Sequence, residues 1–143
     1  MTDWQRLAAF SPYQTATAVR DALQSGQTDE AAKGLEELID ALSRADRRAL
    51  QSHLIRLMTH IIKWNVQPGW RSRSWTDTIA DARESIAEIQ EDTPSLTDEV
   101  VRDMWERALR KALREARRET GLDVPPTPLT WEDVFDTAYT VES

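Results

Sequence analysis

Between Leu50 and Trp64 the apolar residues recur at the three- and four-residue spacing of an α-helix. At about 100° per residue they form one broad face, made by Leu50, Leu54, Leu57, Met58, Ile61, Ile62 and Trp64. Pro68-Gly69 ends the pattern, because a proline removes a backbone donor and clashes with the preceding turn. This stretch therefore predicts a long helix with a strongly apolar face.

The rest of the chain shows similar helical patterns, whereas its first dozen residues give no clear signal. Ser43 is expected to cap the helix that begins at Arg44, and Leu35, Leu38, Ile39 and Leu42 are the apolar stripe expected of the helix before it. Caps, prolines and glycines predict helices over about 12–24, 28–42, 44–65, 74–91 and 98–118, with a short helix after Thr130. No strand pattern of useful length appears. We therefore expect an all-α fold: a compact helical bundle of four principal helices plus shorter terminal helices.

A chain of 143 residues is expected to form a single helical domain over 1–143. The segment 124–128 reads as a Pro-rich turn, after which a short helix docks on the core. There is no cysteine, which excludes disulfides and thiolate metal sites. No apolar run has the length of a signal peptide or a membrane span, so we expect a cytoplasmic protein without a membrane partner.

Charge alternates in blocks along the chain, with a net charge of −7 that argues against general nucleic-acid coating. Residues 1–42, 76–106 and 119–143 are acidic, and residues 43–75 and 107–118 are basic. The expected use of this alternation is internal, with acidic and basic helices lying side by side and pairing.

Short motifs between Leu35 and Leu96 carry a family resemblance. They are Glu36-Glu37-Leu38-Ile39-Asp40, Arg47-Arg48, His60-Ile61-Ile62-Lys63-Trp64, Gln67-Pro68, Arg71-Ser72-Arg73-Ser74-Trp75, Thr78-Ile79 and Pro94-Ser95-Leu96. In these residues the chain resembles a family of small bacterial helical proteins called domain of unknown function twenty-nine. The segment before Leu35 departs most from the family pattern. The resemblance implies a helical fold for a family-like core over 35–96, and it implies no activity.

A cluster of tryptophan and arginine surrounds the Pro-Gly break. Its members are Trp64, Gln67, Trp70, Arg71, Arg73, Ser74 and Trp75, which we call the Trp/Arg corner. Tryptophan and arginine dominate binding hot spots, so this corner is a candidate surface for a protein partner. The structural alternative is that Arg71 satisfies helix carbonyls or pairs with an acid such as Glu37, and that Trp75 plugs the core below the turn. That alternative is favoured for Trp64 and Trp75, and it is evenly matched for Trp70 and Arg73.

His53 and His60 lie seven residues apart and share a helix face. If the preceding helix faces them, Glu37 or Asp40 could join His60 in a metal site within the bundle. Neither histidine has the glutamate three residues before it that di-iron bundles use. The favoured alternative is a buried His60 that is hydrogen-bonded to a carboxylate or carbonyl, with His53 at the edge of the apolar stripe, so no metal or other cofactor is expected.

The helix expected over 98–118 concentrates positive charge on one face. The face carries Arg107, Arg110, Lys111, Arg114, Arg117 and Arg118. It is a possible phosphate-binding stripe for nucleic acid. The favoured alternative is a solvated face, in which Asp103 pairs with Arg107 and Glu106 with Arg110 at four-residue spacing.

Signatures of nucleophilic catalysis are missing from the sequence: there is no cysteine, no nucleophile elbow and no phosphate-cradling glycine loop. No catalytic residue is assigned. The expected function is a protein-partner-binding or regulatory module acting through the Trp/Arg corner, with a possible homo-oligomer. Two alternatives stay open, a nucleic-acid-binding protein using the basic helix face and a metal-dependent enzyme using His60.

Overall fold

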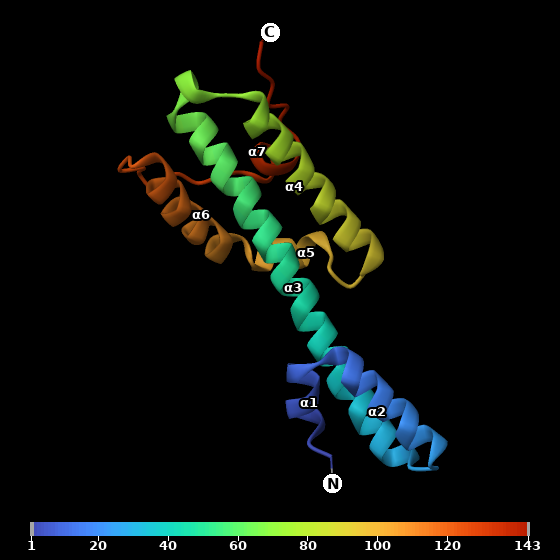
Figure 1. The fold of residues 1–143 in the computed structure, drawn as a ribbon. Coiled ribbons are helices and arrows are strands. Elements are labelled where there is room, and N and C mark those ends of the chain that lie inside the picture. Colours follow the sequence, from blue (N-terminus) through green and yellow to red (C-terminus); the bar gives the residue numbers. More distant parts are fainter. Residues whose placement is uncertain (1, 143) are drawn as a thin grey trace. The chain divides into compact units, whose positions relative to one another are not determined.

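The computed structural model describes residues 2–142 of the chain, and over that range it is all-α (Figure 1). The elements in chain order are α1 (Trp4–Phe10), α2 (Pro12–Gln24), α3 (Thr28–Val66), the 3-10 turn η1 (Pro68–Trp70), α4 (Arg73–Asp92), α5 (Asp98–Asp103), α6 (Trp105–Thr120) and α7 (Trp131–Phe135). The expected fold class is confirmed. None of the helices in this range is both long enough and apolar enough to cross a bilayer.

Contacts divide the chain into two compact units, residues 1–48 and 49–143. The first unit holds α1, α2 and the N-terminal part of α3, and the second holds the rest of α3 and α4 to α7. The expectation of one helical domain over 1–143 stays a prediction.

Helix α3 runs for 39 residues without a break, so the predicted boundary at Ser43 is wrong (Figure 1). A serine favours a helix start only where the chain before it leaves the helical conformation. Here Ala41 and Leu42 precede Ser43 and Arg44 and Ala45 follow it, and all four are good helix formers. No glycine or proline lies between Gly34 and Pro68 to interrupt the helix.

The first unit packs around Trp4, which the sequence did not single out. The Trp4 indole is buried with Val19, Ala22 and Ala31, and its Nε1–H donates to a Glu30 carboxylate oxygen at 2.9 Å. A β-carbon built on Gly34 would stand 2.6 Å from the Trp4 ring, so α3 offers a side-chain-free surface to this indole. Asp3 and Ser11 cap α1 and α2, which accounts for a first helix where no helical pattern was recognised.

The stripe predicted to form the core of the 28–42 helix is largely exposed. Leu35, Ile39 and Leu42 are 48%, 51% and 47% exposed, and Leu38 is half-buried. The small residues Ala31, Gly34 and Ala41 are buried instead. This part of the prediction is wrong, because α1 and α2 approach α3 on its small-residue face.

The second unit buries the apolar face that the sequence predicted between Leu50 and Ile62. The core adds residues from α4, α5, α6 and the C-terminal segment, among them Ile79, Ala82, Ile86, Leu96, Val101, Ala108, Ala112, Ala116, Val124, Leu129 and Val134. Ser72 caps α4, Gly121 ends α6 with a φ of 69°, and Thr130 and Asp133 form the predicted capping box of α7. The helix predicted over 98–118 is interrupted at Met104, which separates α5 from α6.

Candidate functional site

Within the Trp/Arg corner, Trp64 and Arg71 contact each other. The Arg71 guanidinium carbon lies 4.6 Å from the centre of the Trp64 ring, and Arg71 Nε–H donates to the Trp64 carbonyl at 2.9 Å. Trp64 is only 7% exposed and meets Tyr139 edge-on at 5.6 Å. Arg71 therefore covers the indole and satisfies a carbonyl at the end of α3, as the structural alternative predicted.

Trp75 has a different environment from the one predicted. It is half-buried and does not belong to the main core, and the Lys63 ammonium lies 4.9 Å from its ring centre. Lys63 also pairs with Glu119 of α6 at 3.0 Å. The indole therefore does not plug the core; it packs under a lysine at the edge of the unit.

Four of the seven corner residues are exposed, and Arg71 is one of them although it covers Trp64. Trp70 lies in η1 with 73% of its surface exposed, and Arg73 and Ser74 are exposed at the start of α4. Gln67 is half-buried and precedes η1 without a side-chain capping bond. A partner docking here would meet Trp70, Arg71, Arg73 and Ser74.

The predicted metal residues do not come together. Glu37 and Asp40 belong to the first unit and His60 to the second, and all three lie on the uninterrupted α3, so the preceding helix that was expected to face His60 is part of the same helix. The facing arrangement needed a helix break that does not exist. Within residues 2–142 no group of three or more His, Cys, Asp or Glu side chains is arranged to hold a metal.

His60 instead has a local structural role. Its Nδ1–H donates to the Arg56 carbonyl at 2.9 Å, since a carbonyl can only accept. Burial lowers the pKa of the imidazole below its usual value, an effect that the bond to Arg56 partly offsets. The carbonyl partner agrees with the favoured alternative, but His60 is half-buried and not buried as that alternative had it; His53 is also half-buried.

The basic face of α6 is less neutralised than predicted. The expected pairs Asp103–Arg107 and Glu106–Arg110 are absent, and in the part of the chain that the structure describes Arg107, Arg110, Lys111 and Arg114 have no ion pair or hydrogen bond through their side chains. Arg118 pairs with Glu115 at 3.2 Å, and Arg117 Nε–H donates to the Val124 carbonyl at 2.9 Å. The basic side chains of α6 are therefore exposed, as the prediction of a solvated face had it, but the two ion pairs that it included do not form.

A groove runs between this face of α6 and the Pro-rich segment 124–128. Two adjoining hollows of about 480 and 300 Å³ share Arg110, Leu113 and Pro126 in their lining. The full lining is Glu106, Leu109, Arg110, Leu113, Arg114, Arg117, Pro126, Thr127 and Pro128. We call it the α6 groove; it has an apolar floor, a mainly cationic wall on α6 and an uncharged wall formed by the Pro-rich segment.

The far wall of the α6 groove is held by hydrogen bonds to its backbone. Arg117 binds the carbonyl of Val124, and Trp105 Nε1–H donates to the carbonyl of Leu129 at 3.2 Å. These bonds fix the ends of a segment whose prolines already restrict its backbone. The α6 groove is thus built on fixed backbone at both walls.

Aromatic contacts near the C-terminus were missed by the sequence analysis. Trp105 stacks on Trp131 at 5.6 Å, Trp131 lies 4.5 Å from Phe135, and Arg102 covers Trp131 at 4.4 Å. These residues are spread over thirty positions, so only the fold brings them together. The cluster anchors α7 to α5 and α6.

Arg83 and Tyr139 fasten the C-terminal segment to α4. Arg83 Nε–H donates to the Val134 carbonyl at 2.8 Å, and the Tyr139 hydroxyl donates to the Asp133 carbonyl at 2.7 Å. Burial, aided by the Asp133 charge, raises the pKa of Tyr139, and burial lowers that of Arg83. These shifts follow from structural contacts and mark no reactive group.

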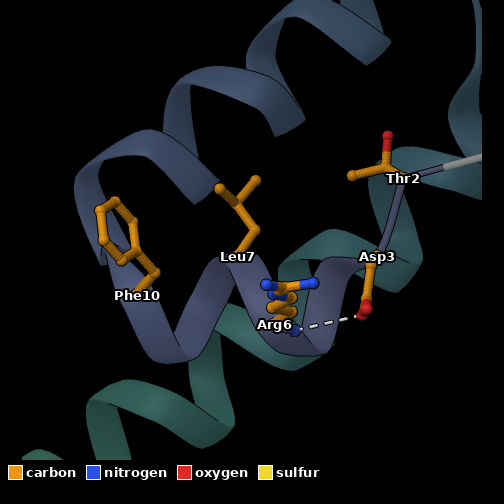
Figure 2. Close-up of a pocket in the computed structure, with 5 residues that line it drawn as sticks. All are labelled: Thr2, Asp3, Arg6, Leu7 and Phe10. Carbon is orange, nitrogen blue, oxygen red and sulfur yellow. Dashed lines mark hydrogen bonds between the residues drawn. The ribbon is translucent and has the colours of Figure 1, made fainter.

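A shallow hollow of about 360 Å³ lies along α1 in the first unit (Figure 2). Thr2, Asp3, Arg6, Leu7 and Phe10 line it, and Figure 2 shows Asp3 occupied in capping α1 through the Arg6 backbone N–H. Its charged groups thus have no evident chemistry. The more prominent feature of this unit is its exposed apolar side chains, which include Phe10 and Tyr13, each 77% exposed.

Comparison with known protein families gives one match. The family model described as "Domain of unknown function DUF29" matches residues 13–140, which is most of the chain. No curated protein and no solved structure matches the chain significantly. The match includes the motifs on which the resemblance was based and extends well beyond them. The chain belongs to the DUF29 family.

Proposed function

We propose that this protein is a partner-binding module that holds an acidic segment of another protein in the α6 groove. The observation that carries the proposal is the set of four cationic side chains, Arg107, Arg110, Lys111 and Arg114, that lack a partner within the described residues. Two of them, Arg110 and Arg114, line a groove with an apolar floor. The proposal keeps the partner-binding function expected from the sequence and moves its main surface from the corner to α6.

Charge is the first argument for an anionic occupant. Arg107, Arg110, Lys111 and Arg114 lie on two successive turns of one helix face, where like charges at such spacing repel. An occupant with carboxylates would relieve this repulsion and accept the forked N–H groups of arginine. Such pairs at a groove rim contribute chiefly to association rate and specificity.

The lining favours a peptide over nucleic acid. Leu109, Leu113 and Pro126 give the α6 groove an apolar floor, which suits an apolar side chain between acidic ones. Single-stranded nucleic acid needs aromatic rings for base stacking, and none lines this groove. The net charge of −7 would also repel the phosphate backbone of a nucleic acid wherever that backbone extends beyond α6.

The exposed corner is the second candidate surface. Trp70 is the most exposed tryptophan of the second unit, and Arg73 lies three residues after it. An exposed indole beside an arginine is a typical binding anchor. This surface would take an apolar or aromatic partner group and would depend little on salt.

Fluorescence anisotropy with two labelled probes tests the proposal. One probe is a glutamate-rich peptide with leucine at every fourth position, and the other is an oligodeoxythymidine. We expect the peptide to bind more tightly than the oligonucleotide, with an affinity that falls as salt rises. The double variant R110E/R114E should weaken peptide binding about tenfold or more, which corresponds to about 1.4 kcal/mol.

The double variant W70A/R73A is the matched control, because it removes the corner and leaves the α6 groove intact. Peptide binding that is lost in W70A/R73A and kept in R110E/R114E would transfer the function to the corner. Tighter binding of the oligonucleotide, lost in R110E/R114E, would instead establish a nucleic-acid-binding protein. Circular dichroism should show equal helix content in all variants, since the replaced side chains are exposed.

A further inference from the structure

The N-terminal half of α3 carries an apolar stripe that its own unit does not cover. Leu35, Ile39 and Leu42 follow the four- and three-residue spacing of one helix face, and about half of each side chain is exposed. Helices α1 and α2 use the other face, where Ala31, Gly34 and Ala41 are buried. An uncovered stripe of this kind is typical of a surface that packs against another helix.

Charges along the same part of α3 are largely segregated by sign, apart from Lys33 and Asp46. The carboxylates Glu36, Glu37 and Asp40 come before Leu42, and the guanidiniums Arg44, Arg47 and Arg48 come after it. None of these six side chains has an ion pair or hydrogen bond within residues 2–142. This segment is therefore complementary in charge to itself when the direction of the helix is reversed.

We propose that two copies of this chain pair through α3 in antiparallel orientation, with a twofold axis between Ile39 and Leu42. In this register Ile39 of one copy lies against the stripe of the second copy near its residue 42. The acidic turns of each helix then lie beside the basic turns of the other. The interface is isologous, so it closes as a dimer and uses the same patch twice.

Glu36 and Arg47 are the pair that best defines the register. At about 100° per residue they lie about 60° and 80° around the helix from Ile39, on the same flank of the stripe. In an antiparallel pair the same flanks meet, so Glu36 of each copy reaches toward Arg47 of the other. A parallel pair would align carboxylates with carboxylates and guanidiniums with guanidiniums, which is unfavourable.

This proposal is independent of the α6 groove, because it uses only residues of the first unit. Light scattering after size exclusion should give twice the chain mass of 16.4 kDa. The variant I39E/L42E should be monomeric, because it places carboxylates in the stripe. Both side chains are about half exposed in the single chain, so helix content by circular dichroism should not change.

A charge swap tests the register. E36R should weaken the dimer about tenfold or more, and E36R/R47E should restore it, because the double change keeps opposite charges across the interface. The matched control is E88R on α4, which replaces an exposed carboxylate of the second unit and should leave the dimer unchanged. Failure of E36R/R47E to restore the dimer would overturn the register.

The orientation can be measured with single spin labels, because the chain has no cysteine of its own. In the proposed dimer, labels at Ser43→Cys lie five residues apart along the axis, whereas labels at Asp29→Cys lie twenty-three residues apart, or about 35 Å. Pulsed dipolar spectroscopy should therefore give a short distance for the first and a long one for the second. Short distances at both sites would mean parallel helices, and a monomeric wild-type chain would overturn the proposal outright.

Discussion

The guanidinium of Arg71 lies 4.6 Å from the centre of the Trp64 ring while its Nε–H binds the Trp64 carbonyl at 2.9 Å. One side chain thus covers an indole and satisfies a carbonyl at the end of α3, where helical partners run out. We expect R71A to lower the free energy of unfolding by about 1–2 kcal/mol, since Arg71 is partly solvated and water screens part of the cation–π attraction. Urea denaturation monitored by tryptophan fluorescence measures this change.

The control for Arg71 is Arg73, which is exposed and has no side-chain bond in the described residues. R73A should change stability by less than about 0.5 kcal/mol, as surface substitutions usually do. Equal losses for R71A and R73A would mean that the Arg71 contacts add nothing specific. R71K separates charge from geometry, because lysine keeps the charge and loses the planar group that stacks on Trp64.

Trp64 and Trp75 should differ in what their loss does to stability. Trp64 is buried against Tyr139, whereas Trp75 is half-buried beneath Lys63. Truncation of a buried tryptophan costs about 3–5 kcal/mol, so W64A should fall in that range and W75A should cost about half as much. Thermal or urea unfolding of the two variants gives the comparison, and a larger loss for W75A would contradict this account of the corner.

Sequence patterns predicted the second unit well because its helices bury large apolar side chains on one face. The stripe Leu50 to Ile62 and the capping box at Thr130 are read from local spacing, and both are found. The first unit was harder to predict, because this kind of prediction relies on large apolar side chains at the helix contacts. Its helices meet over Ala31, Gly34 and Ala41, which give no apolar signal, while the conspicuous stripe Leu35, Ile39 and Leu42 is exposed.

The candidate site depends on contacts that the local spacing of residues in the sequence does not reveal. The α6 groove needs the segment 124–128 to run beside α6, and the bond from Arg117 to Val124 that fixes it is visible only in three dimensions. The pairs expected for Arg107 and Arg110 were reasonable from spacing, yet long side chains at a solvated surface gain little by pairing. The predicted metal site likewise assumed two facing helices, whereas Asp40 and His60 lie on the one helix α3.

Gly34 should tolerate no side chain. A β-carbon there would stand 2.6 Å from the Trp4 ring and 2.8 Å from Val19, so the helices of the first unit would have to separate. We expect G34A to destabilise this unit by about 1–3 kcal/mol, the range for overpacking, despite the better helix propensity of alanine. Amide hydrogen exchange should show the loss of protection in α1 and α2.

The matched control is G69A in the second unit, where a β-carbon would meet nothing within 4 Å. Its φ is not positive, so alanine is free of backbone strain and should be nearly neutral. Unchanged exchange in α1 and α2 of G34A would show that the Trp4 packing is looser than described.

His60 should make stability depend on pH near neutrality. Burial lowers the pKa of its imidazole, so the folded chain favours the neutral ring and the unfolded chain takes up a proton more readily. The stability that this residue contributes is fully present above its unfolded pKa of about 6.5 and is lost as pH falls through the lower folded pKa. Carboxylates also change stability in acid, so the test compares wild type with H60Q, which has no titratable side chain at this position. Urea denaturation between pH 7.5 and 5 should show a smaller loss of stability in H60Q than in wild type. Parallel pH curves for the two proteins would mean that His60 titrates alike in the folded and unfolded chain, and its burial would then have no energetic consequence.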